Sequence, residues 1–292
     1  MFPARRKFRL RLRERSLALG ERTLVMGILN VTPDSFSDGG LYLDVEAAVA
    51  QATALEAAGA DIIDVGGEST RPGSAGISAK EEMRRILPVL RKLRGKIQIP
   101  ISVDTSKSEV AEAVADEGAE ILNDVTGLRN DPGVAQVAQR RKLGLILMHM
   151  RGTPQTMQQA PFARDVIRDV TAGLRRSLTK ARNAGVVRSR LVIDPGIGFG
   201  KSHEQNCEII QRLPQLAKLG FPIMLGTSRK SFLGTALKRS GETDRIWGTA
   251  ATVAAGILQG AHIVRVHDVA EMTQVARVAD VLRSPELLCS SR

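Results

Sequence analysis

Short apolar segments recur along the chain, and each one leads into a longer stretch with helical periodicity. The segments are three to seven residues long and end at polar residues or glycines, which is typical of strands. They occupy residues 23–29, 61–65, 99–103, 120–122, 143–148, 191–193, 222–225 and 263–266. The pattern therefore predicts eight strands.

Between the predicted strands, apolar residues recur at positions i, i+3, i+4 and i+7, which is the spacing of one helix face. Clear examples are residues 45–58, 79–93, 166–184, 203–219 and 269–282. Seven helical patterns lie between the strands and one follows the last strand. Eight β-then-α units in one domain predict an α/β fold of the closed (β/α)8 TIM barrel type. An open doubly wound sheet is the alternative, but it usually has fewer strands and a topological switch point.

The N-terminal segment has a different period. Phe8, Leu10 and Leu12 alternate with arginines, which is the signature of a strand with one buried face, and Gly20 suits the end of a hairpin. We therefore expect a single domain with a hairpin over residues 1–22, a barrel over 23–283 and a tail over 284–292. An arginine-rich organelle transit segment is the alternative for this region, weakened by Glu14 and by Ser16 being the only early serine.

Composition narrows the class of protein. At 292 residues with 43% hydrophobic residues, the chain can bury a large core without disulfides or metals. The net charge of +11 could attract a polyanionic small substrate, but the basic residues are dispersed and aromatic residues make up only 3%, which disfavours nucleic-acid binding. No apolar run reaches the ~18 residues of a membrane span. Cys207 and Cys289 match no metal-ligand spacing, which favours a cytoplasmic location.

Polar side chains follow every predicted strand. They are Asn30, residues 66–73, Asp104, Asn123 with Asp124, His149, Asp194, residues 228–231, and Arg265 with His267 and Asp268. In a closed parallel barrel, the carboxyl ends of all strands meet at one rim, where barrel enzymes place their active sites. The sequence therefore predicts a small-molecule enzyme with its site at this rim.

Eight sequence motifs at these strand ends are more informative about the family of the protein than the presence of polar residues alone. They are MGILNVTPDSFSDGG (26–40), DVGGESTRPG (64–73), SVDTSK (102–107), LNDVTG (122–127), MHMRGTP (148–154), DPGIGFGK (194–201), TSRKS (227–231) and RVHDV (265–269). Together they resemble the dihydropteroate synthase family over almost the whole chain. The resemblance implies a transferase of folate biosynthesis that joins 6-hydroxymethyl-7,8-dihydropterin pyrophosphate to p-aminobenzoate, giving 7,8-dihydropteroate and pyrophosphate. It also implies Mg²⁺, usually a homodimer, and sulfonamides as competing ligands.

The residue types at the rim suit a pterin. Its 2-amino-4-oxo edge is a planar row of donors flanked by an acceptor, so recognition needs a carboxylate facing the donors and a cation or amide facing the oxygen. By the resemblance, Asp194 and Asn123 would bind the pyrimidine edge, Asp104 another part of the ring, and Lys230 the carbonyl side. For Asp194 alone, the Asp-Pro-Gly string also fits an ordinary turn.

Three further side chains would enclose the pterin ring. Arg265 is expected to stack on its face, because a guanidinium is planar, and Met148 and Phe199 are expected to form apolar walls. The glycines around Phe199 also mimic a phosphate-binding P-loop. Only three residues instead of four separate Gly196 from the Gly-Lys pair, however, so a nucleotide site is not predicted.

The pyrophosphate requires cations and a metal. Asn30 supplies a neutral oxygen suited to Mg²⁺, which keeps several waters and takes substrate phosphate oxygens as partners. The resemblance implies that Arg265, His267 and the Thr70 hydroxyl complete this anion site. His267 by itself would equally fit a hydrogen-bonded core histidine.

The two loops after the first and second strands would enclose the aromatic amine. A delocalised pterin carbocation and a weak amine nucleophile favour a dissociative mechanism, with pyrophosphate stabilised as it leaves and water excluded. The resemblance places Asp38 near the developing positive charge, and Phe36, Arg71 and Pro72 around the amine. Ser231 and the N-terminus of its helix would hold the benzoate carboxylate, although an N-cap role also fits Ser231. The expected catalytic set is Asp38, Arg71, Lys230, Arg265 and His267.

Two other functions stay open at this point. A corrinoid-dependent pterin methyltransferase shares the barrel and the pterin carboxylates, but it should lack the Asp-Ser-Phe-Ser-Asp loop and the Ser-Arg-Lys-Ser string, both of which occur here. An inactive paralogue that retains the barrel is the second alternative, which intact loop motifs disfavour.

Overall fold

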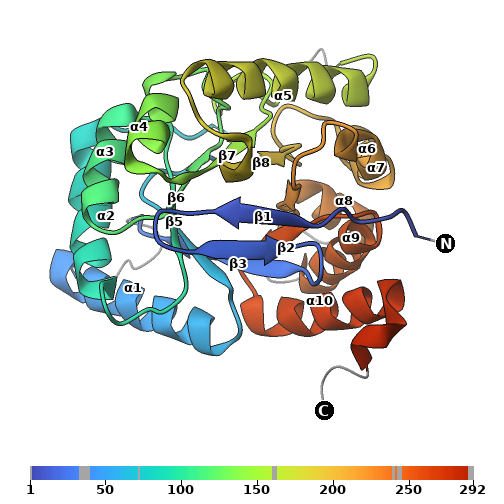
Figure 1. Ribbon diagram of the computed structural model, residues 1–292, viewed down its shortest axis with the longest axis horizontal. Helices are drawn as coiled ribbons and strands as arrows, with labels where there is room; N and C mark the ends of the chain where they lie inside the picture. Colours follow the sequence, from blue (N-terminus) through green and yellow to red (C-terminus); the bar gives the residue numbers. More distant parts are fainter. Residues whose placement is uncertain are drawn as a thin grey trace.

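Eight parallel strands form one sheet in the computed structural model, and helices surround it (Figure 1). The structure describes residues 2–32, 40–71, 73–159, 163–238, 241 and 245–288, without the side chains of residues 40–44. The strands are β3 (Leu24–Asn30), β4 (Ile62–Gly66), β5 (Ile101–Asp104), β6 (Ile121–Asp124), β7 (Gly144–Met148), β8 (Leu191–Asp194), β9 (Met224–Leu225) and β10 (Ile263–Val266). Their order is β8-β7-β6-β5-β4-β3-β10-β9, and a parallel bridge between Ile193 and Ile223 brings the two edges together. The predicted barrel and its eight strands are confirmed.

One or two of the described helices follow each barrel strand along the chain. They are α1 (Gly40–Ala57), α2 (Ala79–Leu93), α3 (Ser108–Asp116), α4 (Gly133–Arg141), α5 (Val166–Asn183), α6 (His203–Gln211), α7 (Leu213–Ala217), α8 (Ser231–Leu237), α9 (Ile246–Leu258) and α10 (Val269–Arg283). The single helix predicted over 203–219 is wrong, because the chain forms α6 and α7 with a break at Arg212. Pro214 lies in the first turn of α7, where its missing N–H is tolerated, whereas in a continuous helix it would remove a hydrogen bond. Among the described residues, no helix is long and apolar enough to cross a bilayer.

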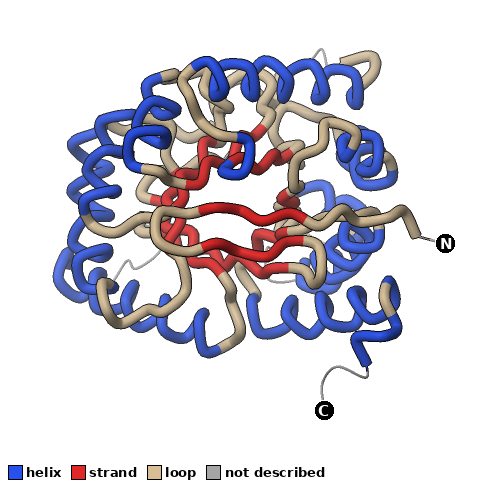
Figure 2. Tube along the Cα trace, viewed as in Figure 1, coloured by secondary structure: helices blue, strands red, loops and turns tan. Residues whose placement is uncertain are grey.

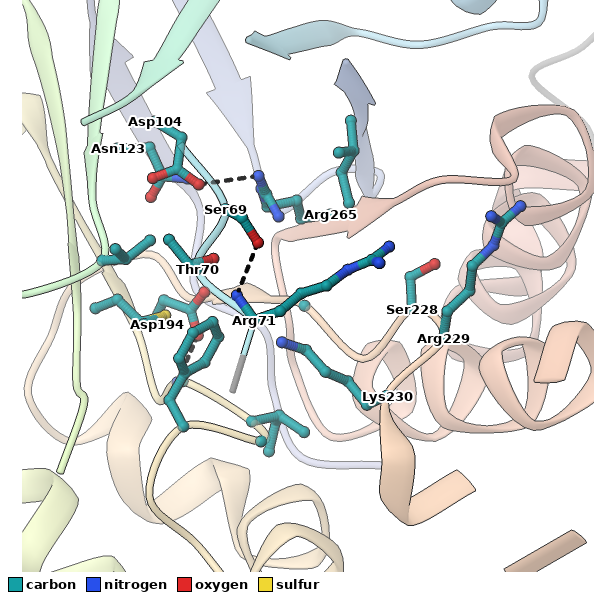
Figure 3. A pocket seen from close by; sticks show the side chains of 18 of the residues that line it. Ser69, Thr70, Arg71, Asp104, Asn123, Asp194, Ser228, Arg229, Lys230 and Arg265 are labelled. Carbon is teal, nitrogen blue, oxygen red and sulfur yellow. Dashed lines mark hydrogen bonds and ion pairs between the residues drawn. The ribbon is translucent and has the colours of Figure 1, made fainter. Parts of the chain in front are cut away.

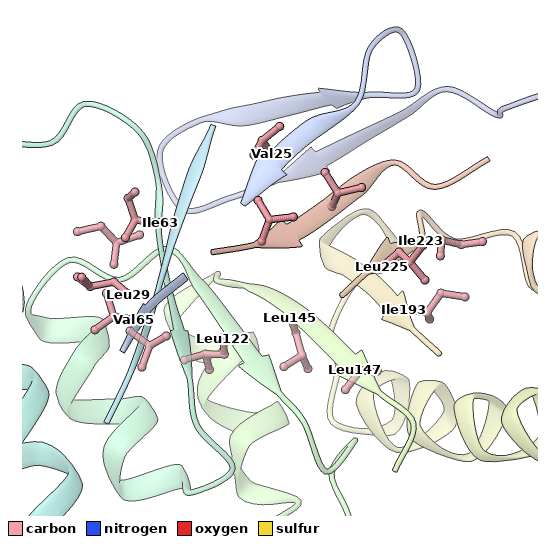
Figure 4. Close-up of a cluster of buried hydrophobic side chains, with 14 of the residues drawn as sticks. Val25, Leu29, Ile63, Val65, Leu122, Leu145, Leu147, Ile193, Ile223 and Leu225 are labelled. Carbon is pink, nitrogen blue, oxygen red and sulfur yellow. The ribbon is translucent and has the colours of Figure 1, made fainter. Parts of the chain in front are cut away.

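Successive strand residues face opposite sides of the barrel wall, and this alternation creates two apolar layers. Val25, Ile63 and Leu122 point outward and pack in the layer between strands and helices (Figure 4). Their neighbours Met26 and Ile62 point inward and belong to a second cluster inside the barrel. Two positions further along each strand, toward its carboxyl end, the next inward-facing side chain lies at the open end of the barrel.

The N-terminal segment forms the predicted hairpin, and it covers the amino end of the barrel (Figure 2). Strands β1 (Phe8–Arg11) and β2 (Ser16–Leu19) pair antiparallel. Leu10, Leu12 and Leu19 pack on the inward cluster, so the hairpin closes one end of the barrel with apolar side chains.

Several arginines of the N-terminal segment bind groups of the barrel. Arg5 donates to Asp280 of α10 at 2.8 Å and to the Thr23 hydroxyl at 2.7 Å, and its side chain is only 4% exposed. Arg13 donates to the carbonyl of Ala115 at the end of α3. Helix carboxyl ends carry unpaired carbonyl groups and a partial negative charge, which guanidinium groups satisfy. Part of the positive charge of this segment therefore stabilises the folded chain through ion pairs and hydrogen bonds to the barrel.

Candidate active site

A cavity of about 450 Å³ opens at the carboxyl end of the barrel (Figure 3). Its lining includes every site residue predicted from the sequence that the structure describes. These are Asn30, Thr70, Arg71, Asp104, Asn123, Met148, Asp194, Phe199, Lys230, Ser231, Arg265 and His267. The structure therefore brings them into one cavity of the size that small-molecule sites usually have. The predicted residues Phe36, Asp38 and Pro72 lie outside the described residues.

An ion network at the base of the cavity joins four strands. Arg265 on β10 donates through Nε to Asp64 Oδ2 at 2.6 Å and through Nη2 to Asp104 Oδ2 at 3.2 Å. Asn123 on β6 donates to the same Asp64 oxygen at 3.0 Å. Arg265 is thus held by two carboxylates, and a planar guanidinium in this position can present its face to a flat ligand.

Asp64 is the functional residue that the sequence reasoning missed. It lies inside the apolar run of β4, between Ile63 and Val65, and its side chain is fully buried. The signal was available, because Asp64 lies two positions after the inward-facing Ile62, and a charge at an inward position of a buried strand requires a partner. The partner could not be inferred, since Arg265 lies 201 positions away.

Asp194 and Lys230 have pKa values that differ from their usual ranges. Burial raises the pKa of Asp194 to about 6, although its Oδ1 accepts a hydrogen bond from the Gly196 backbone at 2.7 Å. Enclosure in the cavity lowers the pKa of Lys230 to about 8, and the nearby cation Arg265 lowers it further. The Lys230 ammonium lies 4.0 Å from the centre of the Phe199 ring, a cation–π contact. Both groups can therefore change charge near neutral pH.

We expect a bell-shaped pH dependence of kcat/KM with limbs near pH 6 and 8. In the role expected for it, Asp194 accepts hydrogen bonds as a carboxylate, so activity should fall as pH drops through its pKa of about 6. Lys230 must be protonated to face a carbonyl oxygen, so activity falls as pH rises through its pKa of about 8. In Lys230→Arg, the alkaline limb should move beyond pH 9, because arginine stays protonated. Identical alkaline limbs in both proteins would contradict the assignment to Lys230.

His267 is neutral, because burial and the nearby Arg265 and Arg229 cations lower its pKa to about 3. The Ser228 hydroxyl lies 3.0 Å from His267 Nδ1 and accepts from the His267 backbone N–H at 3.2 Å. A hydroxyl can accept two hydrogen bonds and donate one, so either atom can be the donor in the Ser228–His267 side-chain hydrogen bond. Ser228 therefore orients the His267 ring, and it is a second cavity residue that the sequence reasoning did not name as a site residue.

The glycine-rich loop after β8 is built around buried contacts. Gly196 has φ +67°, and a Cβ at this position would lie 2.0 Å from the His149 carbonyl oxygen, so another residue would not fit without a shift. The Lys201 ammonium donates to the carbonyls of His149 and Phe199 at 3.2 and 2.9 Å. Lys201 therefore holds two loops together and is only 3% exposed. A lysine used in this way does not act as the phosphate-binding lysine of a P-loop, so the structure agrees with the rejection of a nucleotide site.

Apolar side chains form one wall of the cavity. Met148 and Phe199 belong to a cluster with Val125 and Met150, as the sequence predicted for the first two. Ser231 is the first residue of α8, and the N-cap is Lys230 without a side-chain capping bond, so the N-cap role considered for Ser231 is wrong. The exposed Ser231 hydroxyl remains available to a ligand.

The end of β3 supplies one oxygen donor of the kind that Mg²⁺ accepts. Asn30 lines the cavity and presents an amide oxygen donor, and the described residues contain no cluster of three or more His, Cys, Asp or Glu that could hold a metal ion. Mg²⁺ keeps several waters and accepts one or two protein oxygens beside substrate phosphates. The residues present therefore fit Mg²⁺ brought with a diphosphate, and they do not form a complete protein cage.

The chain matches one family model, described as "Pterin binding enzyme", over residues 26–267. It is 47% identical to the dihydropteroate synthase of Synechocystis over 90% of this chain and 91% of that protein. The Xanthomonas albilineans dihydropteroate synthase, solved with 4-aminobenzoic acid, superimposes with a TM-score of 0.88 at 41% identity, covering 96% and 99% of the chains. The Yersinia pestis dihydropteroate synthase, solved with a sulfonamide drug, gives a TM-score of 0.88 at 38% identity, covering 95% and 100%.

Proposed function

This chain belongs to the family of pterin-binding enzymes, and from that premise we propose that it is a transferase with dihydropteroate synthase activity. It joins 6-hydroxymethyl-7,8-dihydropterin pyrophosphate to p-aminobenzoate, forming 7,8-dihydropteroate and releasing pyrophosphate. The observation that carries the proposal is the convergence of Asp104, Asn123, Asp194 and Lys230 in one cavity at the carboxyl rim. These side chains come from four different strands or their loops and match the donors and acceptors of a pterin edge.

Pterin binding is assigned to the deep part of the cavity. Asp194 and Asn123 face the pyrimidine edge, Asp104 another part of the ring, and Lys230 the carbonyl. Arg265 covers the ring face, supported by its ion pairs with Asp64 and Asp104. Asn123 Oδ1 and Asp64 Oδ1 are buried without hydrogen-bond partners, and such acceptors gain free energy when a donor reaches them.

The diphosphate is assigned beside the pterin ring, where the cavity residues Arg265, His267 and Thr70 supply a cation and two polar side chains. Asn30 would hold Mg²⁺ there, and the ion would supply charge stabilisation to the phosphate oxygens. The chain's own contribution is to stabilise the leaving pyrophosphate: Arg265 acts through its charge, and His267 donates a hydrogen bond in the tautomer that carries its proton on Nε2. The C–O bond to the pterin methylene breaks first, the delocalised cation is shielded from water, and the aromatic amine then attacks.

The amine substrate is assigned to the rim beside Ser231 and Arg71. The Ser231 hydroxyl and the first backbone N–H groups of α8 would donate hydrogen bonds to the carboxylate, and Arg71 would contact the amine. The roles proposed for Phe36 and Pro72 around the amine, and for Asp38 near the developing positive charge, concern residues outside the described part of the chain. The relatives solved with 4-aminobenzoic acid and with a sulfonamide support this class of ligand. Sulfonamides are accordingly proposed to compete with p-aminobenzoate.

We propose that the protein forms a homodimer and is located in the cytoplasm. Apolar side chains on α9 and α10 are unusually exposed, with Trp247 at 78%, Val278 at 62% and Leu282 at 57%. A surface of this kind is typical of contact with another protein. Sedimentation velocity at micromolar concentration tests the proposal, and a purely monomeric species would contradict it.

A pyrophosphate-release assay tests the enzymatic proposal. We expect rapid release only when the pterin pyrophosphate, p-aminobenzoate and Mg²⁺ are all present, together with equimolar 7,8-dihydropteroate. An inactive paralogue would bind the pterin without release. A methyltransferase would bind a methylated pterin and release no pyrophosphate with p-aminobenzoate.

A further inference from the structure

An ion cluster lies beside the loop between β4 and α2, here called loop 2, of which residues 67–71 and 73–78 are described. Lys107, directly before α3, places its ammonium 2.5 Å from Glu68 Oε2 and 2.5 Å from Glu82 Oε2. The Glu82 side chain, in α2, is fully buried, whereas those of Lys107 and Glu68 are 20% and 21% exposed. One cation thus joins loop 2, α2 and the start of α3.

Glu68 closes the base of loop 2. It lines the cavity, but its carboxylate is already engaged, because Oε2 binds Lys107 and Oε1 accepts from the Ile77 backbone N–H at 3.0 Å. Residues 68 and 77 are at the two ends of loop 2, so this side chain ties its beginning to its end. Thr70 and Arg71 lie between the tied residues.

The base of loop 2 is also held through its backbone. The Gly67 carbonyl accepts from Arg85 of α2 at 2.9 Å, and a Cβ on Gly67 would lie 2.7 Å from the Ile86 side chain. Gly67 is buried, whereas Arg71 and Gly73 are exposed. Loop 2 therefore has a fixed base and an exposed outer part that carries cavity residues.

We propose that the Glu68–Lys107–Glu82 cluster is a positioning device that fixes the base of loop 2, so that Thr70 and Arg71 are held over the reacting groups. None of the three side chains is assigned a contact with substrate. Fixing both ends of a loop restricts its conformations and lowers the entropy cost of ordering its middle over a ligand. The cluster should therefore support steps that need loop 2, namely amine binding and turnover, and leave binding of the pterin ring unchanged.

The test separates these steps with Glu68→Ala, which cuts the tie and leaves the buried Glu82–Lys107 pair intact. We expect kcat to fall and the KM for p-aminobenzoate to rise, together lowering kcat/KM about 10-fold or more, because misplaced groups near the reacting atoms are costly. The calorimetric Kd for the pterin pyrophosphate with Mg²⁺ should stay within about 2-fold. Arg91→Ala is the matched control, since its 2.8 Å ion pair with Glu117 joins the ends of α2 and α3 without touching loop 2, and it should match wild type.

Lys107 provides the second pair of variants. Lys107→Met leaves Glu82 buried without a cation and should reproduce or exceed the loss, whereas Lys107→Arg should restore activity to within about 3-fold of wild type because a cation again bridges the carboxylates. A pterin Kd that weakens as much as the p-aminobenzoate KM in Glu68→Ala would indicate general damage and overturn the proposal.

The inference rests on the proposed role of loop 2 residues, so Arg71→Ala is measured in parallel. Loss of turnover in Arg71→Ala without loss in Glu68→Ala overturns the positioning role alone. Wild-type turnover in both variants overturns the positioning role together with the proposed role of Arg71. Loss in both variants, with pterin affinity retained, is the expected result.

Discussion

Arg265→Met is expected to lower kcat/KM by about 10²–10³-fold and to lower the free energy of unfolding by about 3–5 kcal/mol. The activity effect follows because the guanidinium is proposed to serve both the pterin face and the diphosphate. The stability effect follows because Asp64 and Asp104, whose side chains are 0% and 9% exposed, lose the cation that they share. Steady-state kinetics and urea titration of the same protein measure the two effects.

Two further variants separate catalysis from stability at this position. Adding Asp64→Asn to Arg265→Met removes one uncompensated buried carboxylate, so part of the lost unfolding free energy should return without any recovery of kcat/KM. Arg265→Lys retains a charge but lacks the planar fork that bridges two carboxylates, so it should lie between wild type and Arg265→Met. Unchanged stability in Arg265→Met would contradict the structural role of the network.

Arg5→Met should lower the free energy of unfolding by about 3–5 kcal/mol and leave both KM values unchanged. Its partner Asp280 is 6% exposed and would remain buried without its cation, at the amino end of the barrel and away from the cavity. Lys7→Met is the matched control from the same segment. The Lys7–Glu21 pair is 72% and 63% exposed, so its loss should cost less than about 1 kcal/mol.

Urea denaturation of Arg5→Met and Lys7→Met measures the difference directly. Similar unfolding free energies in the two variants would show that the Arg5–Asp280 pair does not anchor the N-terminal segment. An altered KM in Arg5→Met would show that a change at the hairpin end of the barrel affects substrate binding in the cavity. The comparison with Arg265→Met is informative, because both variants break a buried ion pair and only one pair belongs to the site.

The sequence alone was sufficient for the barrel and for most of the candidate site. Strand and helix periodicities are local properties, so all eight strands could be predicted, and the polar residues at their carboxyl ends were placed at one rim by the geometry of parallel barrels. Asp104, Asn123 and Asp194 illustrate this, since each is the third or fourth residue of its four-residue strand and faces inward. The hairpin could also be predicted from the sequence, because three apolar residues that alternate with arginines require a buried face.

Only the tertiary structure decided which charges are partners. Asp64 joins Arg265 across 201 positions and Arg5 joins Asp280 across 275, while Lys107 selects Glu68 and Glu82 from two other segments. The register between β4 and β10, each paired with β3, and the packing of α2 against α3 create these contacts. Periodicity records which face of an element is buried, but it carries no information on what lies opposite that face, and this is why the ion pairs required the folded chain.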